Sequence, residues 1–260
     1  MNCRPIISTY FLTMIVLTIP LLLLQAFALT LLFWILAGVF FFIPAIIPNC
    51  SLFESRCARF ETQNREIWLT IDDGPDPVDT PQILASLAQH QAHATFFVIG
   101  KQARQYPELI RDILRQGHTI GNHTFTHPVK SFWIGFPSRL ENEIEQASLA
   151  LTQIEEKSIS PFFRAPVGMV NFFLPPLLKK KKLRLIGWSA RGYDAVNAHP
   201  EIVVSRILKD ISPGAIVLIH EGHHPDKSAP FHNPQCIDLL LKKLSELHYK
   251  CVLPSPEQLI

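Results

Sequence analysis

The amino-acid sequence predicts an α/β fold built on a parallel sheet or barrel, preceded by an apolar helical hairpin. Short β-rich runs alternate with helical patterns through residues 65–260, the order that parallel strands joined by helices produce. Several of the β-rich runs end in polar clusters, and α/β barrels build their functional sites at that end of the strands. Residues 5–53 contain no Lys, Arg, Asp or Glu, which separates the beginning of the chain from this pattern.

Residues 1–48 are predicted to form a membrane anchor. A helix crosses a bilayer with about 20 apolar residues, and the uncharged run is long enough for two such helices. We expect transmembrane helices at 6–24 and 28–47, followed by a linker at 49–64. A cleaved signal peptide is the alternative, because Arg4 and the apolar stretch behind it resemble one. Cleavage would still leave a second apolar segment in the mature chain.

The flanks of the uncharged run bear on which side of the membrane the remaining chain faces. Arg4 precedes the run, and Arg56, Arg59 and Arg65 follow it. Basic flanks favour the cytoplasm, so a two-helix hairpin would leave the following domain on the cytoplasmic side of a bacterial inner membrane. One crossing combined with a re-entrant segment would place the domain outside.

The composition of the rest of the chain indicates one globular domain. The chain has 260 residues, and those after the apolar run are enough for a single sizeable core. A formal net charge of +2 gives no indication of nucleic-acid binding. The five cysteines include no Cys-x-x-Cys pair, which disfavours a zinc–thiolate site.

The individual elements of this domain follow from residue periodicity and turn signals. Strands are predicted at 66–71, 94–99, 161–164, 184–189, 215–220 and 250–253. Helices are predicted at 79–89, 106–116, 138–155, 174–181, 200–210 and 233–248. The helix at 138–155 is the best marked, since its apolar residues recur at helical spacing and Ser138 with Glu141 forms a capping-box pattern.

Five polar clusters lie at or just beyond the ends of predicted strands or short extended segments. They are Asp72-Asp73-Gly74-Pro75, 123–128, 164–168, 188–194 and 218–220. The adjacent carboxylates of Asp72 and Asp73 could divide two tasks, metal binding and proton transfer, although Asp-Gly-Pro is also an ordinary turn sequence. His220 ends an apolar strand and suits a general acid, because a buried imidazole needs polar partners.

The spacing of two histidines indicates a metal site. His123 and His127 are four residues apart, and on a helical turn this spacing brings side chains to about 5–6 Å at Cβ, within reach of one ion. A pair of histidines alone is more often structural. Two histidines with one carboxylate form a recurrent catalytic zinc set that leaves a coordination position for water.

Together, these clusters resemble the five motifs of the polysaccharide deacetylase family, which carries the NodB homology domain and is also called carbohydrate esterase family 4. The resemblance covers about residues 65–255 and follows the family's motif order. The similar segments are Thr70-Ile71-Asp72-Asp73-Gly74-Pro75, His123-x-x-x-His127-Pro128, Arg164-x-Pro166-x-Gly168, Trp188 to Asp194, and Leu218-x-His220. The resemblance implies a deformed (β/α) barrel and a metal-dependent hydrolase that deacetylates an N-acetylated sugar.

The resemblance also implies a role for each motif residue. Asp72 would be the catalytic base, oriented by Arg164, and His220 would be the catalytic acid. One divalent metal, zinc first with cobalt or nickel as alternatives, would be held by Asp73, His123 and His127. The backbone N–H of Val167 would stabilise the oxyanion. The substrate pocket would be lined by Pro166, Val167, Trp188 and Leu218.

The fourth motif departs from the family pattern. The family often has an Asp where this chain has Arg191, and that Asp normally supports the catalytic His. Asp194, further along the motif, is retained and is expected to pair with Arg164 as part of the catalytic group. The departure leaves open how His220 is tuned, and it does not touch the predicted metal ligands.

The predicted function is therefore hydrolysis of an N-acetyl group on a glycan by a membrane-anchored enzyme, with the anchor favouring a lipid-linked substrate. A deformylase acting on a lipid-linked amino sugar is one alternative. The other is an inactive carbohydrate-binding or scaffold protein, which Arg191 favours and which the intact set of acidic and histidine residues argues against.

Overall fold

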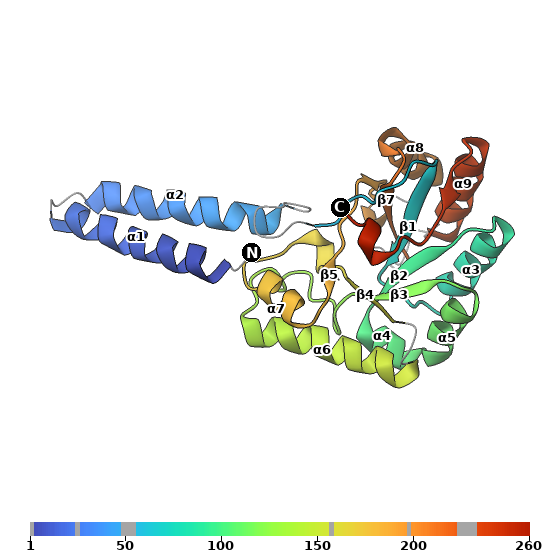
Figure 1. Cartoon of the computed structure of the whole chain (residues 1–260), viewed down its shortest axis with the longest axis horizontal. Coiled ribbons are helices and arrows are strands. Elements are labelled where there is room, and N and C mark those ends of the chain that lie inside the picture. The colour runs from blue at the N-terminus through green and yellow to red at the C-terminus, as the bar shows by residue number, and fades with distance from the viewer. Residues whose placement is uncertain (1–2, 24–26, 48–55, 156–158, 197–198, 223–232) are drawn as a thin grey trace.

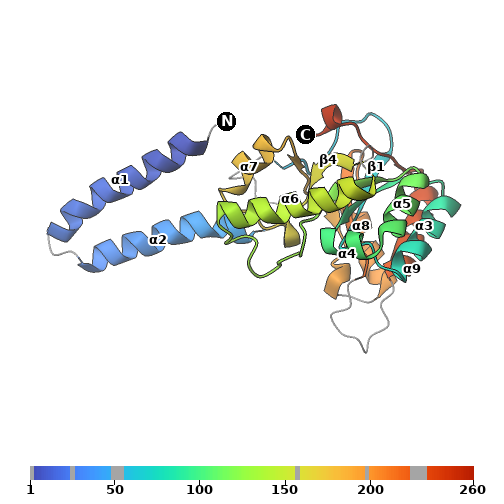
Figure 2. The same ribbon diagram turned by 90° about the horizontal axis from the view of Figure 1, so that it is seen from below.

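The computed structural model describes residues 3–23, 27–47, 56–155, 159–196, 199–222 and 233–260 (Figures 1 and 2). The strands are β1 (Glu66–Asp72), β2 (Ala94–Val98), β3 (Thr119–Asn122), β4 (Ile159–Phe163), β5 (Arg184–Leu185), β6 (Ala190–Arg191), β7 (Ala215–His220) and β8 (Lys250–Cys251). They form an eight-stranded sheet in the order β5-β4-β3-β2-β1-β7-β6, and β8 also pairs with β1. Neighbouring strands run parallel, so the predicted α/β fold with a parallel sheet is confirmed.

Helices connect the strands and cover the sheet (Figure 1). They are α3 (Asp79–Gln89), α4 (Gly100–Gln105), α5 (Pro107–Arg115), α6 (Pro137–Ile154), α7 (Leu174–Lys180), α8 (Pro200–Asp210) and α9 (Asn233–Glu246), with short 3-10 turns η1 (Pro166–Gly168), η2 (Asp194–Val196) and η3 (Pro256–Gln258). α3, α5, α8 and α9 share one hydrophobic core with the central strands. α6 and α7 close a second core near β4 and β5.

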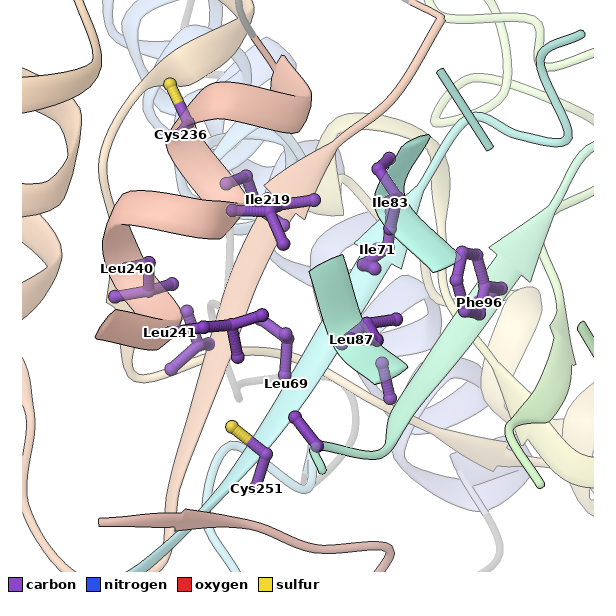
Figure 3. Packing of buried hydrophobic residues seen from close by; sticks show 14 of the residues in the cluster. Leu69, Ile71, Ile83, Leu87, Phe96, Ile219, Cys236, Leu240, Leu241 and Cys251 are labelled. Atoms are coloured by element: carbon purple, nitrogen blue, oxygen red, sulfur yellow. The ribbon is translucent and has the colours of Figure 1, made fainter. Parts of the chain in front are cut away.

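β1 runs through the sheet and is buried on both faces. Leu69 packs toward α3 and α9 in the main core (Figure 3). On the opposite face, the Trp68 ring lies 5.1 Å from that of Phe162, and Trp68 Nε1 donates a hydrogen bond to Thr95 Oγ1 at 2.8 Å. Each large apolar side chain buried in this way contributes about 1.5–3 kcal/mol. β1 therefore holds its last residue, Asp72, on a rigid support.

Strand register brings the polar clusters to one edge of the sheet. The pairing of β1 with β7 places Asp72 directly beside His220. β2 and β3 pair so that Val98 lies opposite Asn122, the residue before the first motif histidine. Because the strands are parallel, their carboxyl ends meet at this edge.

The sequence prediction misses β3, β6 and α4 and makes one strand too long. A Cβ at Gly121 in β3 would lie 2.5 Å from the Phe97 ring, so close packing requires glycine, a residue of low strand propensity. α4 has six residues with a polar composition, and no apolar periodicity marks it. Of the predicted strand at 184–189, only residues 184–185 form a strand, β5, and β6 begins just after the predicted range.

The predicted capping box at Ser138 is wrong. α6 begins at Pro137, its N-cap residue Phe136 is extended, and it has no side-chain cap hydrogen bond. Proline starts a helix well because its fixed φ suits the first turn and it has no N–H to satisfy. Glu141 instead accepts a hydrogen bond from Lys180 Nζ of α7 at 2.9 Å.

The end of the predicted linker packs against the domain. Phe60 is buried, and its backbone N–H donates to the carbonyl oxygen of Gly214 at 3.0 Å. Arg56 is also buried, and its Nη1 donates to the carbonyl oxygen of Gly168 at 2.6 Å. This part of the chain therefore belongs to the domain. The remainder of the predicted linker, at 49–55, lies outside the described residues.

The first part of the chain is a helical hairpin. α1 (Cys3–Leu23) and α2 (Phe27–Ile46) lie side by side (Figures 1 and 2), and they match the two predicted helices to within a few residues. Tyr10 Oη of α1 donates to the carbonyl oxygen of Ala37 in α2 at 3.4 Å. Judged by length and hydropathy, none of the helices in the described ranges qualifies as a membrane span. The predicted membrane crossing is therefore not confirmed.

Candidate active site

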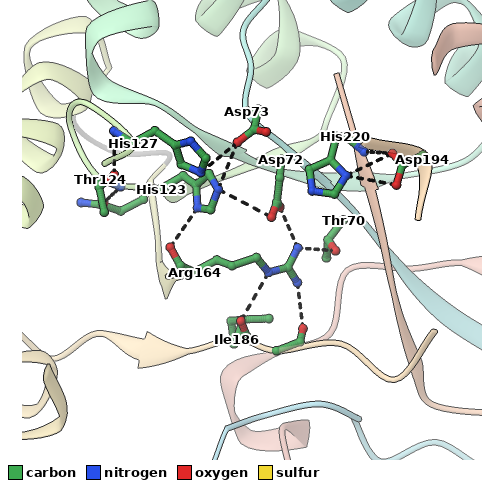
Figure 4. A network of polar contacts seen from close by, with 12 residues as sticks. Thr70, Asp72, Asp73, His123, Thr124, His127, Arg164, Ile186, Asp194 and His220 are labelled. Carbon is green, nitrogen blue, oxygen red and sulfur yellow. Dashed lines mark hydrogen bonds and ion pairs between the residues drawn. The ribbon is translucent and has the colours of Figure 1, made fainter. Parts of the chain in front are cut away.

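The polar clusters that the sequence singles out meet at the carboxyl ends of neighbouring strands (Figure 4). Asp72 is the last residue of β1 and His220 is the last residue of β7. His123 directly follows β3, and Arg164 directly follows β4. Strands far apart in the sequence thus deliver one group of polar side chains to a single edge of the sheet.

Asp73 and two imidazoles form a cluster that fits a metal ion. Asp73 Oδ1 lies 3.3 Å from Nε2 of His123 and 3.3 Å from Nε2 of His127. One ligand atom from each residue lies within 4.8 Å of the other two, and the imidazole centroids are 4.7 Å apart. One carboxylate and two imidazoles are a donor set suited to zinc. The three predicted ligands are therefore brought together.

The charges in this cluster depend on one another. Burial opposes ionisation of Asp73, but His123 and His127 hold the pKa of Asp73 far below its usual value. Burial and the nearby His123 lower the pKa of His127 to about 4. For His123, burial favours the neutral ring, yet Asp72 and Asp73 raise its pKa. An ionised Asp73 and a neutral His127 are the forms that bind a metal.

A backbone contact orients His123. Its Nδ1 lies 2.9 Å from the carbonyl oxygen of Arg164, and a proton on Nδ1 makes this a hydrogen bond. In the neutral ring, the other nitrogen, Nε2, which lies 3.3 Å from Asp73 Oδ1, is then the one that can bind a metal. Metal-binding histidines are commonly held in this way by a backbone or carboxylate acceptor.

The two histidines lie on a loop and not on the helical turn that the sequence prediction assumes. Thr124 and His127 have φ values of 66° and 52°, which a right-handed helix excludes. The carboxylate of Glu143 in α6 accepts hydrogen bonds from the N–H groups of Phe125 and Thr126 at 3.0 and 2.8 Å and shapes the loop. Sequence reasoning misses Glu143. Its signal in the sequence is an acidic residue on the apolar face of the helix, between Leu140 and Ile144.

Arg164 is fully buried and fixes the position of Asp72. Its Nη1 donates to Asp72 Oδ1 and to Thr70 Oγ1, both at 2.7 Å. Its remaining donors bond the carbonyl oxygens of Ile186 at 3.3 Å and Gly187 at 2.8 Å. The predicted contact between Arg164 and Asp72 is confirmed.

Asp194 supports His220 and does not pair with Arg164, so that part of the prediction is wrong. Asp194 Oδ2 accepts the backbone N–H of His220 at 2.6 Å, and His220 Nδ1 lies 3.1 Å from both carboxylate oxygens. The reason is topological, because β6 runs beside β7 and delivers the start of η2 to the end of β7. Burial alone would lower the pKa of His220, but Asp194 raises it to about 10.

A cavity of about 110 Å³ opens between these groups. It is lined by Asp72, Asp73, His123, His127, Val129, Val167, Gly168, Trp188, Ala195, Leu218 and His220. At Gly168, a Cβ would lie 2.3 Å from the Trp188 ring, so glycine lets the ring close this wall. Pro166 is buried and, within the described residues, is not part of the lining, contrary to the prediction. It begins the η1 turn that carries Val167 to the cavity.

A further buried carboxyl group, that of Glu221, lies next to His220 in the sequence. Glu221 is fully buried, and its Oε2 bonds the hydroxyl of Thr80. It fills the space beside Gly74, where a Cβ would lie 1.8 Å from Glu221 Oε1. Burial, together with the nearby Asp76 and Asp79, raises the pKa of Glu221 to about 8. Sequence reasoning misses this role of Glu221. The one signal in the sequence is that Glu221 directly follows the motif residue His220.

Comparison with known proteins supports the class of chemistry that this geometry indicates. Residues 60–201 match the family model described as polysaccharide deacetylase. A chitooligosaccharide deacetylase from Bradyrhizobium sp. (strain ANU 289) is 36% identical over 183 residues, covering 70% of this chain and 83% of that protein. A peptidoglycan-N-acetylglucosamine deacetylase from Bacillus cereus is 35% identical over 192 residues, covering 72% of this chain and 85% of that protein.

Solved structures share the fold. The peptidoglycan deacetylase PdaC from Bacillus subtilis aligns with a TM-score of 0.65 at 28% identity, covering 73% of this chain and 88% of that one. A carbohydrate esterase family 4 pseudoenzyme from Bacillus anthracis also aligns with a TM-score of 0.65, at 23% identity, covering 75% of this chain and 65% of that one. Since a pseudoenzyme has this fold, the fold alone does not decide activity.

The fold and the matched sequences together define a hydrolase of carbohydrate amide bonds, as distinct from peptide bonds. The chain belongs to the polysaccharide deacetylase family. The predicted deformed α/β barrel of the NodB type is confirmed as a curled parallel sheet that closes only part of a barrel.

Replacing Asp194 with Asn is expected to lower the pKa of His220 from about 10 toward its ordinary value of 6.5, because the amide keeps an acceptor and loses the negative charge. NMR titration of the imidazole measures the shift. Asp210→Asn, at the exposed end of α8, is the matched control and should leave this pKa unchanged. An unaltered pKa in Asp194→Asn would show that another group holds the proton on His220.

Glu221 is expected to make the free energy of unfolding fall as pH rises from about 4.5 toward 8. In the unfolded chain this carboxyl loses its proton near 4.5, whereas the buried group keeps it up to about 8. The folded state thus binds one more proton within this window, which costs about 1.4 kcal/mol of stability per pH unit. Glu221→Gln should remove this contribution.

Urea unfolding at several pH values within that window measures the effect of Glu221. Glu201→Gln, an exposed change on α8, serves as the control and should keep the wild-type slope. The same pH slope in the wild type and in Glu221→Gln would contradict the expected proton uptake.

Proposed function

We propose that this protein removes the N-acetyl group from a sugar unit of a glycan by metal-dependent hydrolysis. The observation that carries the proposal is the meeting of the acidic and histidine side chains around one small cavity (Figure 4), namely Asp72, Asp73, His123, His127 and His220. The relatives named as chitooligosaccharide and peptidoglycan-N-acetylglucosamine deacetylases support an N-acetylated glycan as the substrate class.

Asp73, His123 and His127 would hold the metal. Their oxygen and nitrogen donors suit zinc, and cobalt or nickel accept the same set. When bound, the metal would polarise the amide carbonyl and lower the pKa of a water molecule in the site. The hydrogen bond between His123 and the carbonyl oxygen of Arg164 aims one ligand in advance.

Asp72 and His220 would move the protons. Arg164 orients the Asp72 carboxylate, whose Oδ2 lies 3.7 Å from Nε2 of His123 and so faces the metal cluster. Asp72 would take a proton from the attacking water. His220 is protonated at neutral pH because its pKa is raised, and with Asp194 on its Nδ1 side it would donate a proton to the leaving amine from Nε2. The products are an amino sugar and acetate.

The apolar wall of the cavity would receive the methyl of the acyl group. Trp188 and Leu218 line this wall beside Val167, whose backbone N–H would stabilise the developing oxyanion. A formyl group has no methyl and would leave the wall uncovered, so the lining favours acetyl over the formyl alternative.

We further propose that the hairpin attaches the enzyme to the bacterial inner membrane, with the domain on the cytoplasmic side and a lipid-linked glycan as substrate. The hairpin exposes many large apolar side chains, including those of Phe11, Ile15, Leu29, Ile35 and Phe40, and exposed apolar patches mark membrane or partner surfaces. The basic residues at both of its flanks support the cytoplasmic orientation.

Asp73→Ala or His127→Ala is expected to abolish both stoichiometric metal binding and release of acetate from N-acetylglucosamine oligomers, because each change removes one of three ligands. Calorimetric titration with zinc measures binding, and an acetate assay measures turnover. His90→Ala is the control, because His90 contacts Asp238 and belongs neither to the metal cluster nor to the cavity lining. This variant should keep both zinc binding and acetate release. Undiminished hydrolysis by metal-depleted His127→Ala would rule out the proposed metal dependence.

Membrane attachment predicts that the full-length protein stays with the membrane fraction after alkaline carbonate extraction. The domain should resist protease added to intact spheroplasts if it faces the cytoplasm, and cleavage would assign it to the outer side. Release by carbonate would contradict the anchor. Mass spectrometry of membrane glycolipids from cells with the wild type or His127→Ala shows whether a lipid-linked sugar loses acetyl or formyl.

A further inference from the structure

Arg191 has no task in the reaction described above, although it stands next to the cavity. We propose that Arg191 forms a binding site for an anionic group, a carboxylate or a phosphate, that the sugar substrate carries outside the acyl cavity. This inference rests on the proposed deacetylation, because it names a feature of the substrate of the same site. It explains why a cation occupies the position where the family often has an acidic residue.

Strand register puts Arg191 on the cavity side of the sheet. β6 pairs with β7 so that Ala190 lies opposite Val217, and Arg191 lies opposite Leu218. Paired residues of neighbouring strands project to the same face, and successive residues alternate. Ala190 and Val217 belong to the core beneath the helices, whereas Leu218 lines the cavity. Arg191 therefore projects to the face that carries the active site.

Two aromatic rings hold the guanidinium in place. Its central carbon lies 4.1 Å from the ring centroid of Tyr193 and 5.5 Å from that of Trp188. Trp188 is part of the cavity wall. The positive charge of Arg191 is therefore separated from the cavity by no more than this one side chain. Stacking restricts the guanidinium and leaves its N–H edge available for a bidentate anion.

The charge of Arg191 is not neutralised by a neighbouring carboxylate. Among the described residues, no acidic side chain forms an ion pair with it. The nearest catalytic carboxylates already have partners, since Asp72 bonds Arg164 and Asp194 bonds His220 (Figure 4). A second cation, Arg206, lies 5.8 Å from the Tyr193 ring. An anion bound here would accept charge-assisted hydrogen bonds from Arg191, which are stronger than hydrogen bonds between neutral groups. The nearby charge of Arg206 would favour the same anion.

Arg191 adjoins the Trp188 wall of the acyl cavity and stacks on Tyr193, which is exposed to solvent. A charged group that the sugar carries outside this cavity would meet the guanidinium here. A neutral N-acetylglucosamine oligomer offers Arg191 no charge. An oligomer whose reacting sugar bears a carboxylate or a phosphate would place an anion beside the guanidinium. Hydrogen bonds to a charged group of this kind typically change kcat/KM by about 10- to 100-fold.

The test uses three oligomers of equal length, namely the neutral N-acetylglucosamine form, its C6-carboxylate form and its 1-phosphate form. The metal-loaded full-length enzyme should prefer at least one anionic form by about tenfold or more in kcat/KM. Arg191→Gln should reduce this ratio to near one, and Arg191→Lys, which keeps the charge without the planar fork, should keep part of it. The anionic form that is preferred identifies the source of the charge.

Lys209→Gln, which removes one exposed positive charge from α8, is the matched control and should keep the wild-type ratio. Unfolding temperature and zinc content show whether Arg191→Gln is folded. Equal ratios in the wild type and Arg191→Gln would overturn the inference.

Binding measured by calorimetry with the same oligomers separates this inference from the proposed function. Tighter binding of an anionic oligomer that is lost in Arg191→Gln supports the anion site even if no oligomer is hydrolysed, and in that event it is the proposed deacetylation that fails. Equal binding of the neutral and anionic oligomers by the wild-type protein overturns the anion site.

Discussion

The buried guanidinium of Arg164 joins most of the catalytic edge into one unit. Its side chain bonds Thr70 and Asp72 in β1 and the backbone at Ile186 and Gly187. Its own carbonyl oxygen faces His123 Nδ1. Removing one member of such a buried charge pair typically costs about 3–5 kcal/mol, because the other charge is left unpaired. The orientation of Asp72 and that of His123 therefore depend on the same residue, through its side chain in the first case and through its backbone carbonyl in the second.

The histidine–aspartate pair on the other side of the cavity has a separate origin. Asp194 reaches His220 because β6 lies beside β7, so no contact with Arg164 is needed. Asp72 therefore lies beside a cation and His220 beside an anion, so the two side chains differ in their electrostatic surroundings. Neither of them uses Arg191.

The sequence predicts the strands and helices well wherever an element is long and regular in pattern, as at β1, β7 and α6. It fails where packing overrides propensity, as at Gly121, which the Phe97 ring requires. It brings out the three residues of the cluster that fits a metal ion, because their motif spacing is visible along the chain. It misses Glu143 and Glu221 and misassigns Asp194, because their partners come from elements whose adjacency only the folded sheet sets.

The contact between Arg56 and the carbonyl oxygen of Gly168 fixes where the chain enters the catalytic domain. Nine residue steps separate Ile47, just after the second hairpin helix, from Arg56, and a fully extended chain of that length spans at most about 30 Å. Gly168 is itself part of the cavity lining. The short connection therefore keeps the end of the hairpin within about 30 Å of the residue that contacts this lining. A surface that bound the hairpin would therefore also set the largest distance from that surface at which a glycan could enter the cavity.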